Sequence, residues 1–279
     1  MVVAMSDIRR TIRALDLAGK PVSVHSSLRS FGRVERGATT ILQGLLAEGC
    51  TVLVPSFSIA AFAIAPPALP EMRPARNGLH YKSSTTFYLS GRSEIYTPDI
   101  REIDLSMGSL PALMVNKLER VRGNHPLNSF AAIGPLAATL IMEQTPLDVY
   151  APLRALTELG GSIILMGVGL ERMTFLHYAE QEAGRVPFRR WANGLDGKPA
   201  SVAVGSCSEG FDHFAPLLAP LNQQFLVGES IWQVFPARKT LKIAVEAIAS
   251  MPTITQCDDS DCERCIDAIQ GGPLLAVRP

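Results

Sequence analysis

Pro21-Val-Ser-Val-His-Ser-Ser-Leu-Arg29 is the stretch that decides the fold, together with the later segment Thr51-Val-Leu-Val-Pro55. Each begins with an apolar run that predicts a short buried strand. Between them, residues 39–48 carry isoleucine and leucine at helical spacing, and Gly49 ends that segment. A helix between two strands supplies the crossover that a parallel pair requires. The predicted fold class is therefore α/β, with a mainly parallel central sheet flanked by helices.

The same alternation recurs along the chain. Residues 151–159 predict a helix that two glycines break, and Ser162-Ile-Ile-Leu-Met-Gly-Val168 predicts another fully buried strand. Residues 237–250 predict a later helix. Near the start, Ser6 is expected to cap a helix that ends at Gly19.

Two regions depart from this alternation. Residues 58–105 are rich in proline and alanine and predict a long surface excursion, a kind of loop that often carries function. Residues 186–235 contain Asn-Gly and Asp-Gly turn signals and a strand candidate at 225–235, which together predict an antiparallel β subdomain. With a cysteine-bearing tail at about 252–279, these regions are expected to form one domain over 1–279.

Composition narrows the class of partner. The chain has 279 residues, 26 basic and 26 acidic side chains, and 47% hydrophobic residues. A zero charge balance indicates neither nucleic acid nor an anionic membrane as a partner. No apolar run approaches the ~20 residues of a membrane span, and no secretory leader is apparent. We therefore expect a cytoplasmic protein with a small-molecule ligand; the oligomeric state is not predicted.

The strongest candidate for chemistry lies in Gly167-Val-Gly-Leu-Glu-Arg-Met-Thr-Phe-Leu-His-Tyr-Ala-Glu180. Here a buried strand ends in Gly-Val-Gly and a helix begins near Thr174, which puts His177 in the first helical turn. Open α/β sheets bind ligands at the carboxyl ends of their strands. A neutral histidine there can take a proton from an amine. The alternative is a surface histidine beside a capping threonine.

Two further segments fit a ligand site. His25-Ser26-Ser27-Leu28 follows a strand, and its amides and hydroxyls can cradle a pyrophosphate, although it lacks the P-loop and dinucleotide spacings. Asn124-His-Pro-Leu-Asn-Ser129 leads into small residues that let a backbone approach a ligand closely. Each segment can equally be a structural turn or a loop packed on the core.

Four motifs occur in one order along the chain: Val24-His-Ser-Ser-Leu28, Met107-Gly-Ser-Leu-Pro111, His125-Pro-x-x-Ser129, and Gly167-Val-Gly169 followed by Thr174, His177 and Glu180. Together they resemble the aminoglycoside 3-N-acetyltransferase family, also called antibiotic N-acetyltransferases. The resemblance extends over nearly the whole chain. It implies the antibiotic N-acetyltransferase fold and transfer of an acetyl group from acetyl-CoA to a primary amine.

The resemblance also implies roles for single residues. The coenzyme A site would be lined by residues from three of the motifs, namely His25, Ser26, Ser27, Leu28, Arg29, Ser109, His125 and Ser129. His177 would be the general base, with Thr174 beside it, for direct transfer in a ternary complex. A carboxylate would orient the imidazole. Glu209 is the first choice for this acid, and Asp212 and Glu180 are the alternatives.

The acceptor amine is where the chain departs from the family. Drug-modifying members hold a polycationic sugar among carboxylates in the region matching 58–105. Here no acid occurs before Glu71, and basic residues follow at Arg73, Arg76, His80 and Lys82. A polycation would find little complementary charge. The acceptor is therefore either an aminoglycoside or, in an acyltransferase of secondary-metabolite biosynthesis, a less cationic amine.

Two other functional classes compete with the transferase. A coenzyme A-binding protein without turnover would have no need of a base such as His177. A hydrolase would use Ser26 or Ser129 as its nucleophile, but no Gly-x-Ser-x-Gly elbow surrounds either serine.

The tail contains Cys257-Asp-Asp-Ser-Asp-Cys262-Glu-Arg-Cys265. Three thiols at this spacing suggest a structural zinc site before a disulfide, and Cys207 is the candidate fourth ligand. The alternative is that these are free thiols that bind no metal.

Overall fold

The computed structural model describes residues 2–64 and 94–270. Its main sheet has seven strands in the order β11-β12-β8-β2-β4-β7-β6. In that order, their bounds are Gln223–Val227, Ser230–Pro236, Ser162–Met166, Pro21–Ser26, Thr51–Pro55, Phe130–Ile133 and Val121–Arg122. A short parallel pair, β1 (Val2–Val3) with β3 (Arg33–Val34), lies beside it.

The centre of this sheet is parallel, as predicted. Strand β2 pairs in parallel with both β4 and β8. The outer pairs are antiparallel, so β11, β8, β2, β4 and β6 point one way and β12 and β7 the other. The fold class is therefore confirmed, with reversed strands on either side of the parallel core.

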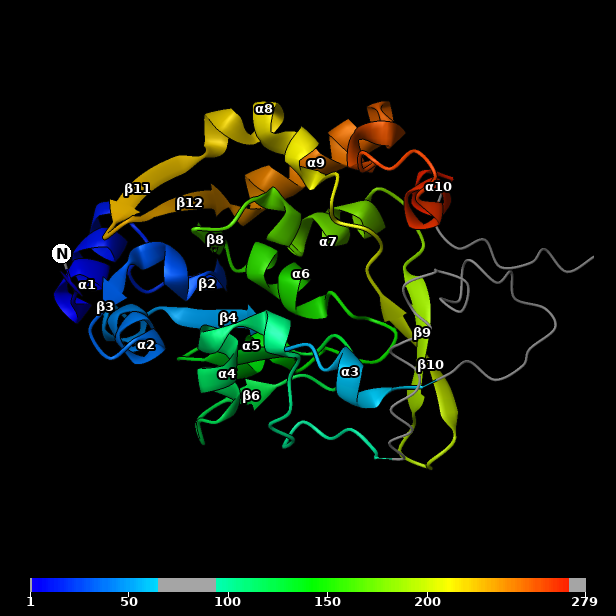
Figure 1. Cartoon of the computed structure of the whole chain (residues 1–279), viewed down its shortest axis with the longest axis horizontal. Helices are drawn as coiled ribbons and strands as arrows, with labels where there is room; N and C mark the ends of the chain where they lie inside the picture. Colours follow the sequence, from blue (N-terminus) through cyan, green and yellow to red (C-terminus); the bar gives the residue numbers. More distant parts are fainter. Residues whose placement is uncertain (1, 65–93, 271–279) are drawn as a thin grey trace, which may run out of the picture.

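Helices cover both faces of the main sheet (Figure 1). On one face lie α1 (Met5–Ala14), α2 (Ala38–Ala47) and α4 (Ser109–Val115). On the other lie α5 (Ala137–Ile141), α6 (Ala151–Glu158), α7 (Phe175–Glu182) and α9 (Ala237–Ser250). Within the described ranges, no helix is both long enough and apolar enough to cross a bilayer.

Alternation along the strands explains why two cores form. In β8, Ile163 and Leu165 pack into one core and Ile164 and Met166 into the other. Successive side chains of a strand point to opposite faces, so a strand covered on both faces is a continuous apolar run. The bounds of α2, α6 and α9 agree with expectation to within one residue, whereas α1 ends at Ala14 and not at Gly19. At the N-terminus, however, α1 begins at Met5, and the Asp7 carboxylate, not Ser6, accepts the N–H of Ala4 at 2.9 Å.

The region predicted to be an antiparallel subdomain divides between two sheets. Strands β9 (Phe188–Asn193) and β10 (Pro199–Val204) form a hairpin that pairs with β5 (Ala63–Ile64). In contrast, β11 and β12 extend the main sheet through β8. The single strand expected at 225–235 is a hairpin because Gly228 turns the chain with φ +62°.

The predicted surface excursion 58–105 is described only at its two ends, because residues 65–93 lie outside the described part. Its start includes α3 (Ile59–Phe62). The Asp104 carboxylate accepts hydrogen bonds from the N–H groups of Ile59 and Ala60 at 3.0 and 2.9 Å. One carboxylate thus joins the beginning and the end of the excursion beside the main sheet.

A buried arginine fastens the same region to the sheet. Arg122, in β6, is 4% exposed. Its guanidinium donates to the carbonyls of Ser56, Ile100 and Glu102, and its Nε donates to Ser129 Oγ at 3.0 Å. Three segments are therefore held by one side chain.

We expect Arg122→Met to lower the free energy of unfolding by at least about 3 kcal/mol, since it leaves several buried acceptors without a donor. For a chain of this size, that loss lowers Tm by roughly 6 °C or more. Thermal unfolding of the variant is the measurement. Arg10→Met is the control, because the Arg10 side chain is 72% exposed; equal stability of the two variants would contradict the assignment.

Candidate active site

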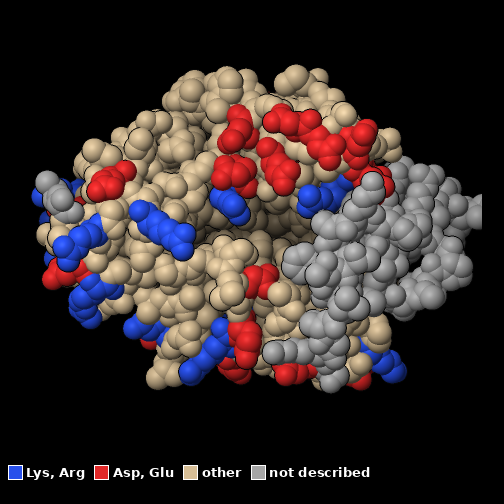
Figure 2. All heavy atoms as spheres, in the orientation of Figure 1, with Lys and Arg blue, Asp and Glu red and all other residues tan. Residues whose placement is uncertain are grey.

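The carboxyl ends of the three central strands open into one cleft of about 1090 Å³. It is lined by residues 24–29 at the end of β2 and just beyond it, by Pro55 and Phe57 at the end of β4, and by Gly167–Gly169 after β8. Figure 2 shows this side of the molecule hollowed near its middle, with carboxylates gathered above the hollow and basic side chains at its edge. Single small-ligand sites measure ~300–1,000 Å³, so the cleft has room for two ligands.

The predicted 25–29 loop forms one wall of the cleft. All five of its residues line it, as does Ser109 from the start of α4. Two hydrogen bonds to backbone carbonyls hold the loop. The N–H of Ser27 donates to Met166 O at 3.0 Å, and Ser30 Oγ donates to Ser27 O at 2.7 Å. Burial, with the charge of Arg172, lowers the pKa of His25 to about 4. His25 is therefore neutral at physiological pH.

Gly167 allows the loop after β8 to meet this wall. It has φ +66°, and a Cβ there would lie 2.0 Å from Ser30 Oγ. A side chain would therefore displace Ser30. This close approach accounts for the first glycine of the Gly-Val-Gly motif.

His177 lies in the first turn of α7 and lines the cleft. Its Nδ1 lies 2.7 Å from Glu180 Oε2, and the other oxygen of Glu180 lies 2.6 Å from Arg185 Nη1. Glu180 and Arg185 are both buried, at 5% and 8% exposure. A carboxylate only accepts hydrogen bonds, so Nδ1 must be the donor. In neutral His177 the unprotonated nitrogen is consequently Nε2.

Aromatic and backbone contacts fix the imidazole plane. Tyr150 stacks on His177 with 6.4 Å between ring centroids and 16° between planes, and Phe211 meets the ring edge-on at 4.7 Å. Gly205 closes the third side, because a Cβ there would lie 2.8 Å from both His177 Cδ2 and the Tyr150 hydroxyl. Burial and the Glu180 charge raise the pKa of Tyr150 well above its usual value. Tyr150 is therefore a neutral neighbour.

The carboxylate beside His177 is Glu180, one of the two alternatives to our first choice. Glu209 has electrostatic contacts with Cys207 and Arg264 instead. Asp212 accepts the N–H of Leu170 at 3.2 Å. The i, i+3 spacing of His177 and Glu180 puts them on one helix face, which is the signal in the sequence that points to Glu180.

Thr174 lines the cleft, but its side chain does not cap α7. Its carbonyl accepts the N–H of His177 at 3.0 Å. The helix-capping threonine of the alternative interpretation is therefore not observed.

His125 and Ser129 were predicted to line the coenzyme site, and the structure places both outside the cleft at 0% exposure. His125 Nε2 donates to Ala203 O at 2.7 Å, while its Nδ1 accepts the N–H of Asn128 at 2.8 Å. Ser129 Oγ bonds to Arg122. Both side chains hold the 124–129 segment in place through these buried hydrogen bonds. Asn128 is the member of this segment that lines the cleft.

Sequence reasoning missed several lining residues. Tyr150, Gly205, Arg190 and Arg264 come from four separate segments, and none belongs to a local pattern that would single it out. Arg172 does lie within the quoted 167–180 motif and follows Gly169 closely. Its position after a strand end was the available signal.

The charge of the cleft is mainly positive. Among its described lining residues, four are arginines, namely Arg29, Arg172, Arg190 and Arg264, and Glu171 is the one acid. Guanidinium groups bind phosphates in a bidentate manner. The cleft can therefore hold a phosphate-bearing ligand next to a histidine that is set up to accept a proton.

Known proteins share this architecture. The model of the family described as aminoglycoside 3-N-acetyltransferase matches residues 24–249. Aminoglycoside N(3)-acetyltransferase IX of Micromonospora chalcea is 32% identical over 186 residues, which cover 64% of this chain and 62% of that protein. The match thus spans about three fifths of that relative.

Two solved structures show the same fold. The apoenzyme of aminoglycoside acetyltransferase AAC(3)-IVa matches with a TM-score of 0.76 and 23% identity, covering 97% of this chain and 98% of that one. AAC-IIIb, solved as a binary complex with CoASH, matches with a TM-score of 0.70 and 19% identity, covering 90% and 97%. With the match over residues 24–249, the chain belongs to the aminoglycoside 3-N-acetyltransferase family.

Proposed function

We propose that the protein is an acetyl-CoA-dependent N-acetyltransferase that acylates a primary amine, with His177 as general base. The observation that carries this proposal is the His177–Glu180 pair, with 2.7 Å between Nδ1 and Oε2. The pair adjoins a cleft with room for both a cosubstrate and an acceptor. Because acetyl-CoA is an intracellular metabolite, we keep the cytoplasm as the expected location.

Acetyl-CoA would be held by the 25–29 loop and Ser109. The loop offers serine hydroxyls and main-chain amides to the pyrophosphate, and Arg29 and Arg172 supply positive charge. Neutral His25 adds a hydrogen-bonding group without repelling or attracting the phosphates. The related AAC-IIIb has been solved with CoASH, which supports the same cosubstrate here.

Transfer would proceed directly between the two bound substrates. The amine nitrogen attacks the thioester carbonyl, the carbon–sulfur bond breaks, and coenzyme A leaves as a thiolate, which then accepts the proton that His177 has taken from the amine. His177 Nε2 takes the proton that the amine loses. The Glu180 carboxylate stabilises the imidazolium that forms, as the aspartate does in a Ser-His-Asp triad. Arg185 pairs with that buried carboxylate and holds it in place.

Hydrolysis by a serine nucleophile receives no support from Ser129. Its hydroxyl is fully buried and bonded to Arg122 and Ser56. A nucleophile must reach its substrate. Ser26 lines the cleft within the 25–29 loop. There its hydroxyl would donate a hydrogen bond to coenzyme A, and a role as nucleophile is not needed to explain it.

For the acceptor, we propose an amine that carries few positive charges. With Arg29 and Arg172 assigned to acetyl-CoA, the described lining of the cleft still presents Arg190 and Arg264 against one acid, Glu171. Like charges brought together cost several kcal/mol, so a polycationic aminoglycoside is the weaker candidate. The basic residues Arg73, Arg76, His80 and Lys82 lie outside the described residues.

Replacing His177 by alanine is expected to lower kcat by at least ~10²-fold while coenzyme A still binds, because a general base contributes about that much. Thiol release from acetyl-CoA in the presence of amine gives the rate, and calorimetry gives the binding. His213→Ala is the matched control, as His213 is exposed and does not line the cleft. Unchanged turnover of His177→Ala would remove this residue from the mechanism.

Paired amide variants separate Glu180 from Glu209, the first of the three candidate acids. Glu180→Gln is expected to lower kcat at least ~10-fold, because the imidazolium loses its carboxylate. Glu209→Gln is expected to keep near-normal kcat, since the electrostatic interactions of Glu209 are with Cys207 and Arg264. The reverse ranking in steady-state assays would return the orienting role to Glu209.

Acceptor charge can be tested with a graded amine panel. We expect kcat/KM for glucosamine, which has one ammonium group, to exceed that for a multiply charged aminoglycoside at least ~tenfold at equal ionic strength. Thiol release reports each rate, and a no-amine sample controls for hydrolysis. Preference for the aminoglycoside would overturn the acceptor assignment but not the transfer reaction.

A further inference from the structure

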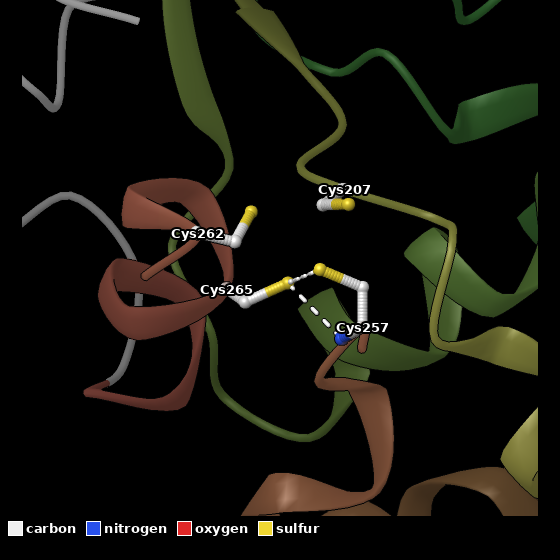
Figure 3. Close-up of side chains that lie close together, drawn as sticks. All are labelled: Cys207, Cys257, Cys262 and Cys265. Carbon is white, nitrogen blue, oxygen red and sulfur yellow. Dashed lines mark hydrogen bonds between the residues drawn. The ribbon is translucent and has the colours of Figure 1, made fainter. Parts of the chain in front are cut away.

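Four cysteines from two distant parts of the chain meet outside the cleft (Figure 3). Cys207 comes from the loop after β10, whereas Cys257, Cys262 and Cys265 come from the segment that leads into α10 (Glu263–Ile269). Their four sulfur atoms all lie within 4.8 Å of one another. All four are free thiols.

The cluster has the dimensions of a tetrahedral metal site. Zinc–sulfur bonds of about 2.3 Å put the corners of a tetrahedron about 3.8 Å apart. The sulfurs of Cys257 and Cys265 are 3.5 Å apart, and the others lie within the 4.8 Å limit. That spacing needs only small side-chain adjustments to admit an ion, and it is well beyond a disulfide bond of about 2 Å.

The surroundings suit a thiolate-bound ion. Cys207, Cys257 and Cys265 are 2%, 7% and 2% exposed, so the site is closed on most sides. The N–H of Cys257 points to Cys265 Sγ at 3.4 Å, and such outer contacts orient metal ligands. Arg264 interacts electrostatically with Cys207, Cys262 and Cys265. Its charge offsets part of the net −2 that four thiolates and Zn²⁺ carry together.

We propose that Cys207, Cys257, Cys262 and Cys265 bind one structural zinc ion. Four sulfur ligands complete the coordination shell and leave no position for substrate, which is typical of structural sites. Zinc suits this set because soft thiolates in a tetrahedron select it, with iron as the competing ion.

The site would fasten the tail to the loop that borders His177. Gly205 packs closely against the His177 imidazole. The next residue is Ser206, whose Oγ lies 3.3 Å from Glu180 Oε2. Cys207 follows directly. Arg264, between two of the proposed ligands, lines the cleft. Zinc would therefore hold two walls of the active site together without taking part in the transfer.

The test is metal analysis of the full chain purified without a metal-affinity step. We expect about one zinc ion per chain and little iron. Cys262→Ser removes the least buried ligand and should weaken zinc binding more than ~100-fold in a chelator competition, because loss of even an outer-shell partner costs about 10–100-fold. Cys50→Ser is the matched control, since Cys50 is buried and bonds to Leu17 O instead; it should keep its zinc.

Two further measurements keep the result independent of folding in the variants and of catalysis. Cobalt added to chelator-treated wild type should give the intense visible absorption of a tetrahedral thiolate site. Stripping the zinc from wild type should lower Tm, and adding zinc back should restore it. Metal-free protein that fails to bind cobalt, stoichiometric iron in place of zinc, or a Cys262→Ser variant that retains zinc as well as Cys50→Ser does would each overturn the proposal. None of these readouts depends on acetyl transfer.

Discussion

A buried carboxylate held between a histidine and an arginine is the constraint on which the site depends. Glu180 is 5% exposed, with His177 Nδ1 on one oxygen and Arg185 on the other. An ionised carboxylate at such depth is tolerated only when it is paired. Arg185 supplies the permanent charge and is itself anchored by Thr255 Oγ1 and Pro252 O. The interactions that orient the histidine therefore extend to residues outside the cleft.

The parallel core of the fold was predictable because its strands are buried on both faces. Such strands are continuous apolar runs, and the helix between β2 and β4 left a clear 3.6-residue period. The pairing of the outer strands was not predictable. Whether β11 and β12 join the main sheet or the small one depends on contacts with β8, and turn residues such as Gly228 fix a hairpin but not its partner.

The candidate site was predictable where its residues follow a strand end. The 25–29 loop and His177 both do so, and both line the cleft. Prediction failed where a polar residue of a motif points inward. His125 and Ser129 share the residue types of a binding loop, but their hydrogen bonds go to Ala203 O and Arg122. Local sequence does not tell a ligand-binding hydroxyl from one that satisfies a buried guanidinium.

The contacts of Arg185 have a consequence for synthesis of the protein. Among the residues that the structure describes, its partners Pro252 and Thr255 follow in chain order every one that lines the cleft except Arg264. Because a domain generally folds as a unit during synthesis, the contacts of Arg185 form only after Pro252 and Thr255 have been made. Until residue 255 leaves the ribosome, Glu180 has Arg185 but Arg185 lacks its anchors. The histidine of a nascent chain is therefore not fully held in place until residue 255 has emerged.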